Sequence, residues 1–376
     1  MIHTFELYAV IRYSTYETLI KSGLFTYNRR KQTYYYADYK LLNKNGFCKF
    51  FIKKTNFNFK QCFMKIIVNP SKLIKSETGP LATFNPMKNK YDDIKYFFRI
   101  AFVEIMEKVQ NYSAEVMDEI YFFSDIDNLN ITRIDYCINI FLEDQNEVKQ
   151  YLKLLSKGDI PHKHGAKFVK SAKGMKGCYY TNKSININFY NKLEQMLAHN
   201  KNTRSDENKY TKDEIDAAKN ILRLEVQCKS CLFNRKTFKK TYGDNRKLCF
   251  SEVIARDFIH KYLIEISQNG DYYKKSKVEN AIERQRPVKF KSIQRKNGSK
   301  YKNMLSLFRK VSAPNCKGIW KYRQSLNKNE RGKMDKTLKM FDSVGVNIIT
   351  IPIRYKKDKL LNLWKIAYEQ YFVDVE

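Results

Sequence analysis

Residues 131–141 read ITRIDYCINIF, a run rich in isoleucine with aromatic residues at its centre and its end. β-Branched and aromatic residues favour extended backbone, so this run predicts a β-strand. Two further runs have the same character, ININFYN at residues 185–191 and ILRLEVQCK at residues 221–229. Together they predict the strands of an antiparallel sheet.

Each of these strands carries charged or nucleophilic side chains two positions apart, which places them on one strand face. The residues that share a face are Arg133 with Asp135, Arg223 with Glu225, and Asn188 with Tyr190 and Lys192. If the strands are neighbours, one sheet face presents two carboxylates, two guanidinium groups, a phenol and an ammonium group. Such a face can bind Mg²⁺ or Mn²⁺, because hard divalent ions prefer carboxylate oxygens.

The tyrosine adds a reactive group to this face. A free phenol has a pKa of about 10 and is a poor nucleophile at neutral pH. An adjacent ammonium group such as Lys192 would favour the phenolate, and a metal would neutralise charge on a phosphate. Attack on a phosphodiester would give a covalent phosphotyrosine, from which the break can be resealed. The alternative is that the two Arg-x-acid pairs form only a cross-strand ion-pair network.

The rest of the chain fits an α+β fold with three segments. We expect an N-terminal α+β lobe at residues 1–120, a catalytic α+β lobe at 121–245, and a mainly helical basic region at 246–376. A capping box at Ser14 and Glu17 predicts a short helix that stops at Gly23. The other strands are expected at residues 2–11, 33–37, 47–54, 61–69 and 176–181. The other helices are expected at residues 91–110, 146–156, 193–200, 211–219, 231–240, 250–267, 302–311, 316–325, 328–342 and 357–371. The similar order of elements in the first two segments suggests two related lobes.

The composition points to nucleic acid as the partner. Among 376 residues, 71 Lys and Arg face 39 Asp and Glu, which gives a formal charge of +32, and aromatic residues make up 14%. Interleaved cations and rings suit single-stranded nucleic acid, although an AT-rich genome also inflates Lys and Tyr. Residues 271–310 hold 13 Lys and Arg against 3 Asp and Glu. That region fits either a solvated linker or a surface that contacts the DNA backbone.

The sequence also limits the cellular location. No run of about 18 uncharged apolar residues is present, and the first residues do not have the pattern of a signal peptide. The eight cysteines are scattered, and three of them (Cys62, Cys137 and Cys228) lie within apolar strands. This pattern favours a reducing cytoplasm and no membrane contact. Cys228-x-x-Cys231 lacks a second pair at zinc-site spacing, so we do not expect a zinc site there.

The chain resembles the filamentous-phage gene II type replication initiators and, more distantly, plasmid initiators that nick a double-strand origin. The resemblance is carried by residues 131–135, 189–194 and 222–225, by the opening Met1-Ile2-His3-Thr4, and by Asn69-Pro70-Ser71-Lys72. Residues 301–353 resemble the C-terminal region of the family. The resemblance implies rolling-circle replication, in which the initiator nicks one strand, stays on its 5′ end through a tyrosine, and later rejoins the displaced strand.

Carried onto this sequence, the resemblance assigns the nucleophile to Tyr190 and metal ligands to Asp135 and Glu225. It makes Glu194 a third ligand or a base and Lys192 the partner of the phenolate or phosphate. We also expect contacts with DNA from Arg133, Arg223 and Lys183. The implied partners are duplex and single-stranded origin DNA, with a host helicase and polymerase, and a dimer is allowed. We expect the helical C-terminal part to read duplex sequence, because a helix can enter the major groove.

Several alternatives stay open. In the plasmid branch the tyrosine lies earlier, which makes Tyr179 and Tyr180 rivals of Tyr190. His162 and His164 are the nearest equivalent of the His-hydrophobic-His metal pair of many nickases, but they flank a lysine. The same chemistry would serve a mobilisation relaxase. A non-catalytic origin-binding protein, a metal-dependent nuclease without a covalent intermediate, and an RNA-binding protein are further alternatives.

Overall fold

The computed structural model describes residues 1–55, 61–75, 81–85, 90–109, 112–160, 164–171, 174–203, 209–243, 246–285, 294–313, 316 and 318–373. The chain forms two compact units, each made of segments that are distant in sequence. Unit 1 contains residues 1–138, 183–186 and 225–259, and unit 2 contains residues 139–182, 187–224 and 260–376. Three of the predicted strands have residues in both units: β6 (Asn130–Phe141), β9 (Ile185–Asn191) and β10 (Ile221–Lys229). The α+β class is confirmed, and the three-segment organisation remains a prediction.

Unit 1 is built on an antiparallel sheet with the strand order β2-β3-β4-β5-β1-β6-β10. Its strands are β1 (Ile2–Ile11), β2 (Phe25–Asn28), β3 (Thr33–Tyr36), β4 (Phe47–Lys54), β5 (Cys62–Val68), most of β6 and the C-terminal part of β10. The expected strands at 2–11, 33–37, 47–54 and 61–69 are therefore confirmed. In β1 the residues Phe5, Leu7, Ala9 and Ile11 are buried, whereas Val10 is exposed. This alternation gives the strand one core face and one polar face.

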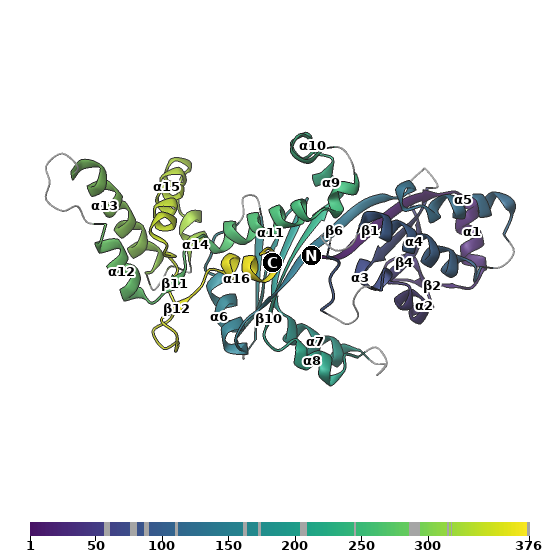
Figure 1. Cartoon of the computed structure of the whole chain (residues 1–376). Coiled ribbons are helices and arrows are strands. Elements are labelled where there is room, and N and C mark those ends of the chain that lie inside the picture. The colour runs from purple at the N-terminus through teal and green to yellow at the C-terminus, as the bar shows by residue number, and fades with distance from the viewer. Residues whose placement is uncertain are drawn as a thin grey trace. The chain divides into compact units, whose positions relative to one another are not determined.

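Helices cover the core face of this sheet. In α4 (Tyr91–Met106), Phe98 stacks on Phe47 of β4 with ring centroids 5.4 Å apart, and Phe102 lies 6.2 Å from Phe50. The helix α5 (Ala114–Ser124) packs against α4 (Figure 1). The remaining helices described in unit 1 are α1 (Tyr13–Lys21), α2 (Tyr39–Lys44), α3 (Pro70–Leu73), η1 (Ile126–Asn128), α9 (Ser230–Phe233), α10 (Lys236–Tyr242) and η3 (Arg246–Phe250). The helix α11 (Glu252–Ser267) starts in unit 1 and ends in unit 2.

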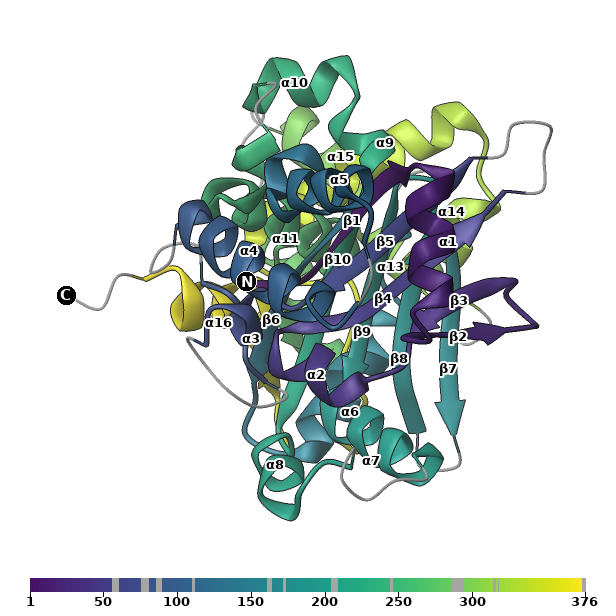
Figure 2. The same cartoon turned by 90° about the vertical axis from the view of Figure 1, so that its right-hand side faces the viewer.

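Unit 2 contains β7 (Gly165–Ser171) and β8 (Gly174–Thr181), which lie beside β9 in the order β10-β9-β8-β7 (Figure 2). The helix α6 (Gln145–Leu155) packs against β8. The Cys178 thiol is 3.5 Å from the Leu152 carbonyl oxygen, and the Tyr180 hydroxyl donates to the Leu155 carbonyl at 3.3 Å. Two helices, α7 (Lys192–Asn202) and α8 (Lys212–Ala217), follow β9.

The C-terminal part of unit 2 is helical, as expected from the sequence. It contains α12 (Lys275–Glu283), α13 (Gln294–Val311), α14 (Ile319–Gln324), α15 (Lys328–Val344), α16 (Leu363–Tyr371) and the short strands β11 (Tyr272–Tyr273) and β12 (Lys359–Leu360). Buried Asp271 accepts a hydrogen bond from the Asn362 amide at 2.9 Å and forms ion pairs with Lys359 and Lys365. The described part of the basic region 271–310 therefore forms packed elements and not a linker.

The structure corrects several expected elements. The capping box at Ser14 and Glu17 is wrong, because α1 begins at Tyr13 with Arg12 as N-cap and no side-chain cap. The helix expected at 231–240 is split into α9 and α10, and that expected at 302–311 starts at Gln294. The strands β2 and β7 were not predicted. Each is an edge strand, paired on one side only among the described residues, and at such a position the pattern of apolar residues is weak.

A close backbone contact joins the end of α6 to the start of α14. Gly318 has φ +118°, and a Cβ there would lie 2.2 Å from the Lys157 carbonyl oxygen. The Ile319 amide donates to that carbonyl at 2.8 Å, and the Trp320 amide donates to the Gly158 carbonyl at 3.2 Å. Only glycine combines this φ with this approach.

In the described residues, no helix has the length and apolar character needed to cross a membrane.

We therefore predict that Gly318→Ala lowers the free energy of unfolding by about 1–3 kcal/mol, because the new Cβ meets backbone and the φ is strained. Gly332→Ala is the matched control, because it lies in α15 and its added methyl group would have no atom of the described residues within 4 Å. That substitution should raise helix stability by up to about 1 kcal/mol. Urea unfolding followed by circular dichroism measures both. Equal stability of the two variants would show that the Gly318 contact is not needed.

Candidate active site

The polar face of the unit 1 sheet carries four side chains that meet across one strand pair. In the antiparallel pairing of β1 with β6, Thr4 lies opposite Asp135 and Glu6 lies opposite Arg133. These four residues form the β1–β6 polar cluster. The neighbouring residue Tyr136 points to the core face, where its hydroxyl donates to the Cys249 carbonyl at 2.8 Å. Period-2 geometry therefore places the cluster on the face opposite that core.

Two β-bulges flank the cluster. The register shifts between Ile2 and Thr4 leave His3 as an extra residue in β1, and those between Glu6 and Leu7 leave Thr132 as an extra residue in β6. A bulge bends a strand and changes the direction of a side chain. Here the Thr132 hydroxyl donates to the Glu6 carboxylate at 2.7 Å, and His3 Nδ1 lies 3.6 Å from Glu225 Oε1 of β10.

Asp135 is the most buried acid of the cluster, with 2% of its surface exposed. The Thr4 hydroxyl donates to its Oδ2, and Arg133 Nε lies 3.0 Å from its Oδ1. The angles of the second contact are not those of a hydrogen bond, so both Asp135 Oδ1 and Arg133 Nε keep unused hydrogen-bonding capacity. We therefore describe this contact as an ion pair.

The electrostatics of the two acids in the cluster differ. Burial, together with the charge of Glu225, raises the pKa of Asp135 to about 6, against the opposing effects of Arg133 and Thr4. Burial also raises the pKa of Glu6, but hydrogen bonds from Thr132 and Lys65 and the nearby positive charges outweigh it, so its pKa is lowered. Asp135 is thus the acid of the cluster that can exchange a proton near neutral pH.

These observations bear on a divalent metal ion. Asp135 has a buried oxygen without a hydrogen-bond partner, and Glu225 and His3 supply an oxygen and a nitrogen nearby. This donor set fits Mg²⁺ or Mn²⁺ in kind. Within the described part of the chain, however, no group of three or more His, Cys, Asp or Glu residues is close enough to hold a metal. The residues thus offer a partial ligand set, to which substrate oxygens would have to contribute.

Unit 2 contains the predicted nucleophile and its neighbours. Tyr190 lies half-buried on β9, immediately before Asn191, the N-cap of α7. The expectation that Lys192 shares a strand face with Tyr190 is wrong, because β9 ends at Asn191 and Lys192 begins α7. Lys192 is buried, donates to Gln195 at 3.0 Å and lies 5.9 Å from the Tyr210 ring centroid.

Glu194 lies in the first turn of α7, where its amide donates to the Asn191 side chain. Its carboxylate forms an ion pair with Lys176 of β8 at 2.8 Å. Sequence reasoning did not find this lysine, since the contact joins residues 18 positions apart on different elements. Glu194 therefore lies in unit 2, whereas Asp135 and Glu225 lie in unit 1.

The rival tyrosines have unequal surroundings. Tyr180 is 1% exposed, its ring packs edge-on against Phe168 and Phe189, and burial raises its pKa well above the ordinary value. Its hydroxyl is held by the Leu155 carbonyl. Tyr179 is half-buried, and its ring lies so close to Gly177 that a Cβ there would be 2.9 Å from its hydroxyl oxygen. Burial therefore favours Tyr190 and Tyr179 over Tyr180 as nucleophiles.

The remaining predicted residues are placed as follows. Arg223 on β10 is fully buried, with 0% exposure, and Lys183 is exposed in the turn before β9. His164 lies beside the Asn182 amide, with Nε2 3.1 Å from its nitrogen, and its ring is 5.8 Å from that of Tyr262. His162 is outside the described residues. All eight cysteines are free thiols, and Cys228 is buried while Cys231 is exposed.

The fold and the site define a strongly basic α+β protein whose acids and tyrosines lie on the strands of antiparallel sheets. Residues 97–247 match the phage family of replication-associated proteins of the gene II type, in the N-terminal region of that family. The match contains residues 131–135, 189–194 and 222–225, and it confirms the resemblance to the gene II type initiators. The other segments that resemble the family, at residues 1–4, 69–72 and 301–353, lie outside the matched range. The family implies initiation of rolling-circle replication. Searches of curated proteins and of solved structures gave no match.

The raised pKa of Asp135 predicts a pH dependence of stability. The folded state keeps this proton up to about pH 6, whereas the unfolded carboxyl releases it near 3.8. Between these values the folded state binds more protons, so the free energy of unfolding should fall by about 1–3 kcal/mol as pH rises. Asp135→Asn should remove this fall, as measured by urea unfolding at several pH values. Asp118→Asn, an exposed acid on α5, is the control. An unchanged profile in Asp135→Asn would contradict the assignment.

Proposed function

We propose that the chain is a replication initiator that nicks one strand of origin DNA through a tyrosine and later rejoins it. The observation that carries the proposal is the family match over residues 97–247, which contains both Asp135 and Tyr190. The formal charge of +32 supports DNA as the substrate, since phosphate contacts need clustered positive charge. A mobilisation relaxase would use the same chemistry for strand transfer.

The proposed reaction is a transesterification. The Tyr190 hydroxyl oxygen attacks the scissile phosphorus, the bond from phosphorus to the 3′ oxygen breaks, and the phenol proton ends on that oxygen. The 5′ phosphate is then bound to tyrosine, and one phosphorus–oxygen bond has replaced another. Attack by a 3′ hydroxyl on the phosphotyrosine reverses these changes and rejoins the strand. Because bond number is conserved, no ATP is required.

The start of α7 supports Tyr190 as the nucleophile. Tyr190 directly precedes the N-cap of this 11-residue helix, whose first amides and dipole favour a phosphate group. We assign Lys192 to the developing charge on the phosphate, and Glu194 to the phenol proton. Glu194 would have to exchange its contact with Lys176 to do so. Tyr179 is kept as the second candidate, because it is also half-buried.

Asp135 of the β1–β6 polar cluster and its neighbours Glu225 and His3 would supply the metal ligands. We propose that Asp135 and Glu225 hold Mg²⁺ or Mn²⁺, with His3 as an additional ligand that the sequence did not suggest. A bound ion there would supply positive charge to a DNA phosphate. Arg133 lies against Asp135 and 3.8 Å from Glu6. Its positive charge would compensate the charge of these carboxylates when no ion is bound. We assign Arg133 and Lys183 to contacts with DNA phosphates, whereas fully buried Arg223 has a supporting role.

The tyrosine assignment predicts that Tyr190→Phe forms no covalent protein–DNA adduct, because phenylalanine has no nucleophilic hydroxyl group. The substrate is a supercoiled plasmid that carries the DNA flanking the gene for this protein. Gel electrophoresis in detergent detects the adduct, and mass mapping of the DNA-linked peptide identifies the residue. Tyr39→Phe, an exposed tyrosine at the start of α2, is the matched control and should retain full yield. If Tyr179→Phe forms no adduct and Tyr190→Phe forms it in full yield, the nucleophile is Tyr179 and not Tyr190. Nicking that survives both substitutions would indicate a nuclease without a covalent intermediate.

The metal assignment predicts that Asp135→Asn and Glu225→Gln each weaken Mn²⁺ binding by about tenfold or more. Calorimetric titration measures this without DNA or turnover. His3→Ala tests the additional ligand, and Asp118→Asn is the control for loss of one negative charge. Unchanged Mn²⁺ affinity in both acid variants would place the ion elsewhere. DNA binding without nicking in the wild type would favour the non-catalytic origin-binding alternative.

A further inference from the structure

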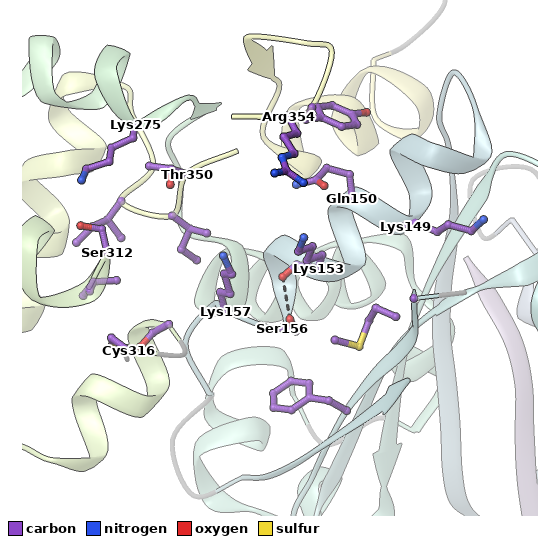
Figure 3. A pocket seen from close by; sticks show the side chains of 18 of the residues that line it. Lys149, Gln150, Lys153, Ser156, Lys157, Lys275, Ser312, Cys316, Thr350 and Arg354 are labelled. Atoms are coloured by element: carbon purple, nitrogen blue, oxygen red, sulfur yellow. Dashed lines mark hydrogen bonds between the residues drawn. The ribbon is translucent and has the colours of Figure 1, made fainter. Parts of the chain in front are cut away.

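A large basic pocket lies entirely within unit 2, in a part of the chain that the proposed chemistry does not use. Its volume is about 1250 Å³. One wall is α6 and the turn that follows it, and Ser312, Cys316 and Thr350 lie on the opposite side (Figure 3). Pockets for drug-sized ligands measure roughly 300–1,000 Å³, so this one has room for a longer occupant.

The charge of the pocket is strongly one-sided. Seven lysines and Arg354 line it, and Asp144 is the single acid among the described residues of its lining. Of these eight basic residues, Lys357 pairs with Glu143 and Glu147, and Lys275 lies 3.8 Å from Glu279. The other six form no ion pair with any acid in the described residues. A polyanion would supply the missing countercharge.

Three of these lysines follow one another at intervals of four along α6 and its end. Residues four apart are neighbours on a helix, and Lys149, Lys153 and Lys157 all line the pocket. In Figure 3 Lys153 and Lys157 lie near each other, whereas the Lys149 side chain points away from them. Burial and the charge of Lys153 both lower the pKa of Lys157. Like charges held this close are unfavourable without a ligand, so an evenly spaced anion would relieve the repulsion.

The floor of the pocket is aromatic and apolar. The rings of Phe168 and Trp320 lie with centroids 5.8 Å apart and are both half-buried. Trp320 is held in place by a hydrogen bond from Nε1 to the Ser156 carbonyl at 3.1 Å, and the contact at Gly318 fixes the backbone beside it. Rigid rings beside a row of cations are the arrangement on which bases stack while phosphates bind the charges.

We propose that this pocket binds a segment of single-stranded DNA, with phosphates on the α6 lysines and a base against Phe168 and Trp320. This inference rests on the proposed function and names where the unpaired strand is held. Duplex DNA fits less well, because its bases are stacked inside and offer no face to the rings. Free phosphate or a mononucleotide would leave most of the six uncompensated cations without countercharge.

Tryptophan fluorescence provides a local test, because the chain has only two tryptophans. Trp364 does not line the pocket and packs 4.4 Å from the His260 ring. In a full-length Trp364→Phe, Tyr190→Phe protein, the remaining signal reports on Trp320, and covalent attachment is blocked. We expect a deoxythymidine oligonucleotide of about 16 nucleotides to quench this signal, and equal concentrations of inorganic phosphate to have little effect. No change at saturating oligonucleotide would overturn the proposal.

Affinity measurements test the charges and the ring. Lys149→Gln/Lys153→Gln should lower the slope of log affinity against log salt by about 1.4, since each lost phosphate contact removes about 0.7. Trp320→Leu should weaken binding by about 5- to 150-fold, and Trp320→Phe should restore most of it. The matched control is Lys336→Gln/Lys339→Gln, which removes the same charge from two exposed lysines on α15. An equal loss in this control would mean that binding follows net charge and not the pocket. Circular dichroism melting confirms that each variant is folded.

Parallel measurements with a duplex and with an oligouridylate of the same length distinguish the occupants. Tighter binding of the duplex would overturn the proposal, and tighter binding of RNA would replace DNA by RNA as the occupant. The outcome is independent of the tyrosine chemistry. Adduct formation with loss of pocket binding would overturn only this inference, whereas pocket binding without any adduct would overturn only the proposed nicking.

Discussion

The antiparallel pairing of β1 with β6 is the constraint on which the candidate metal ligands depend. It places Thr4 opposite Asp135 and Glu6 opposite Arg133, so that a buried carboxylate is met by a hydroxyl donor and a guanidinium group. A slip of one residue would turn Asp135 into the aromatic core around Tyr136 and Phe258, where an acid has no such partners. The apolar alternation of β1 fixes this register, because Phe5 and Leu7 must stay on the core face.

Most of the central strands could be predicted because their sequences alternate or are continuously apolar. The edge strands β2 and β7 were not predicted, because an edge strand pairs with one neighbour and needs a weaker apolar pattern. The start of α1 was also predicted wrongly. Ser14 and Glu17 have the spacing of a capping box, but α1 begins at Tyr13 with Arg12 as its N-cap. Local patterns thus predicted which segments are strands and helices better than where these elements start.

The site shows the same division between local and tertiary information. Arg133 and Asp135 are two apart on one strand, so their shared face could be read from sequence. His3 and Thr132 could not be recognised, because each is the extra residue of a bulge, and a bulge is visible only once the strands are paired. Lys192 was misplaced by extending the strand period past Asn191, whose side chain instead caps the next helix. The Lys176–Glu194 and His3–Glu225 contacts likewise depend on which elements are neighbours in space.

In this strongly basic protein, the buried acid Asp135 lies beside a guanidinium group. DNA phosphates would be repelled by an exposed ionised carboxylate, so a basic protein that binds them loses affinity for each such acid near the backbone. At Asp135 that charge is compensated in two ways, by Arg133 and by a proton up to about pH 6. If a divalent ion binds there, ion and DNA phosphate each reduce the repulsion that the other meets. Their binding must then be mutually reinforcing, because linkage between two ligands is reciprocal. The pocket lysines of unit 2 have no such requirement, and they can hold a strand whether or not the acids of unit 1 are compensated.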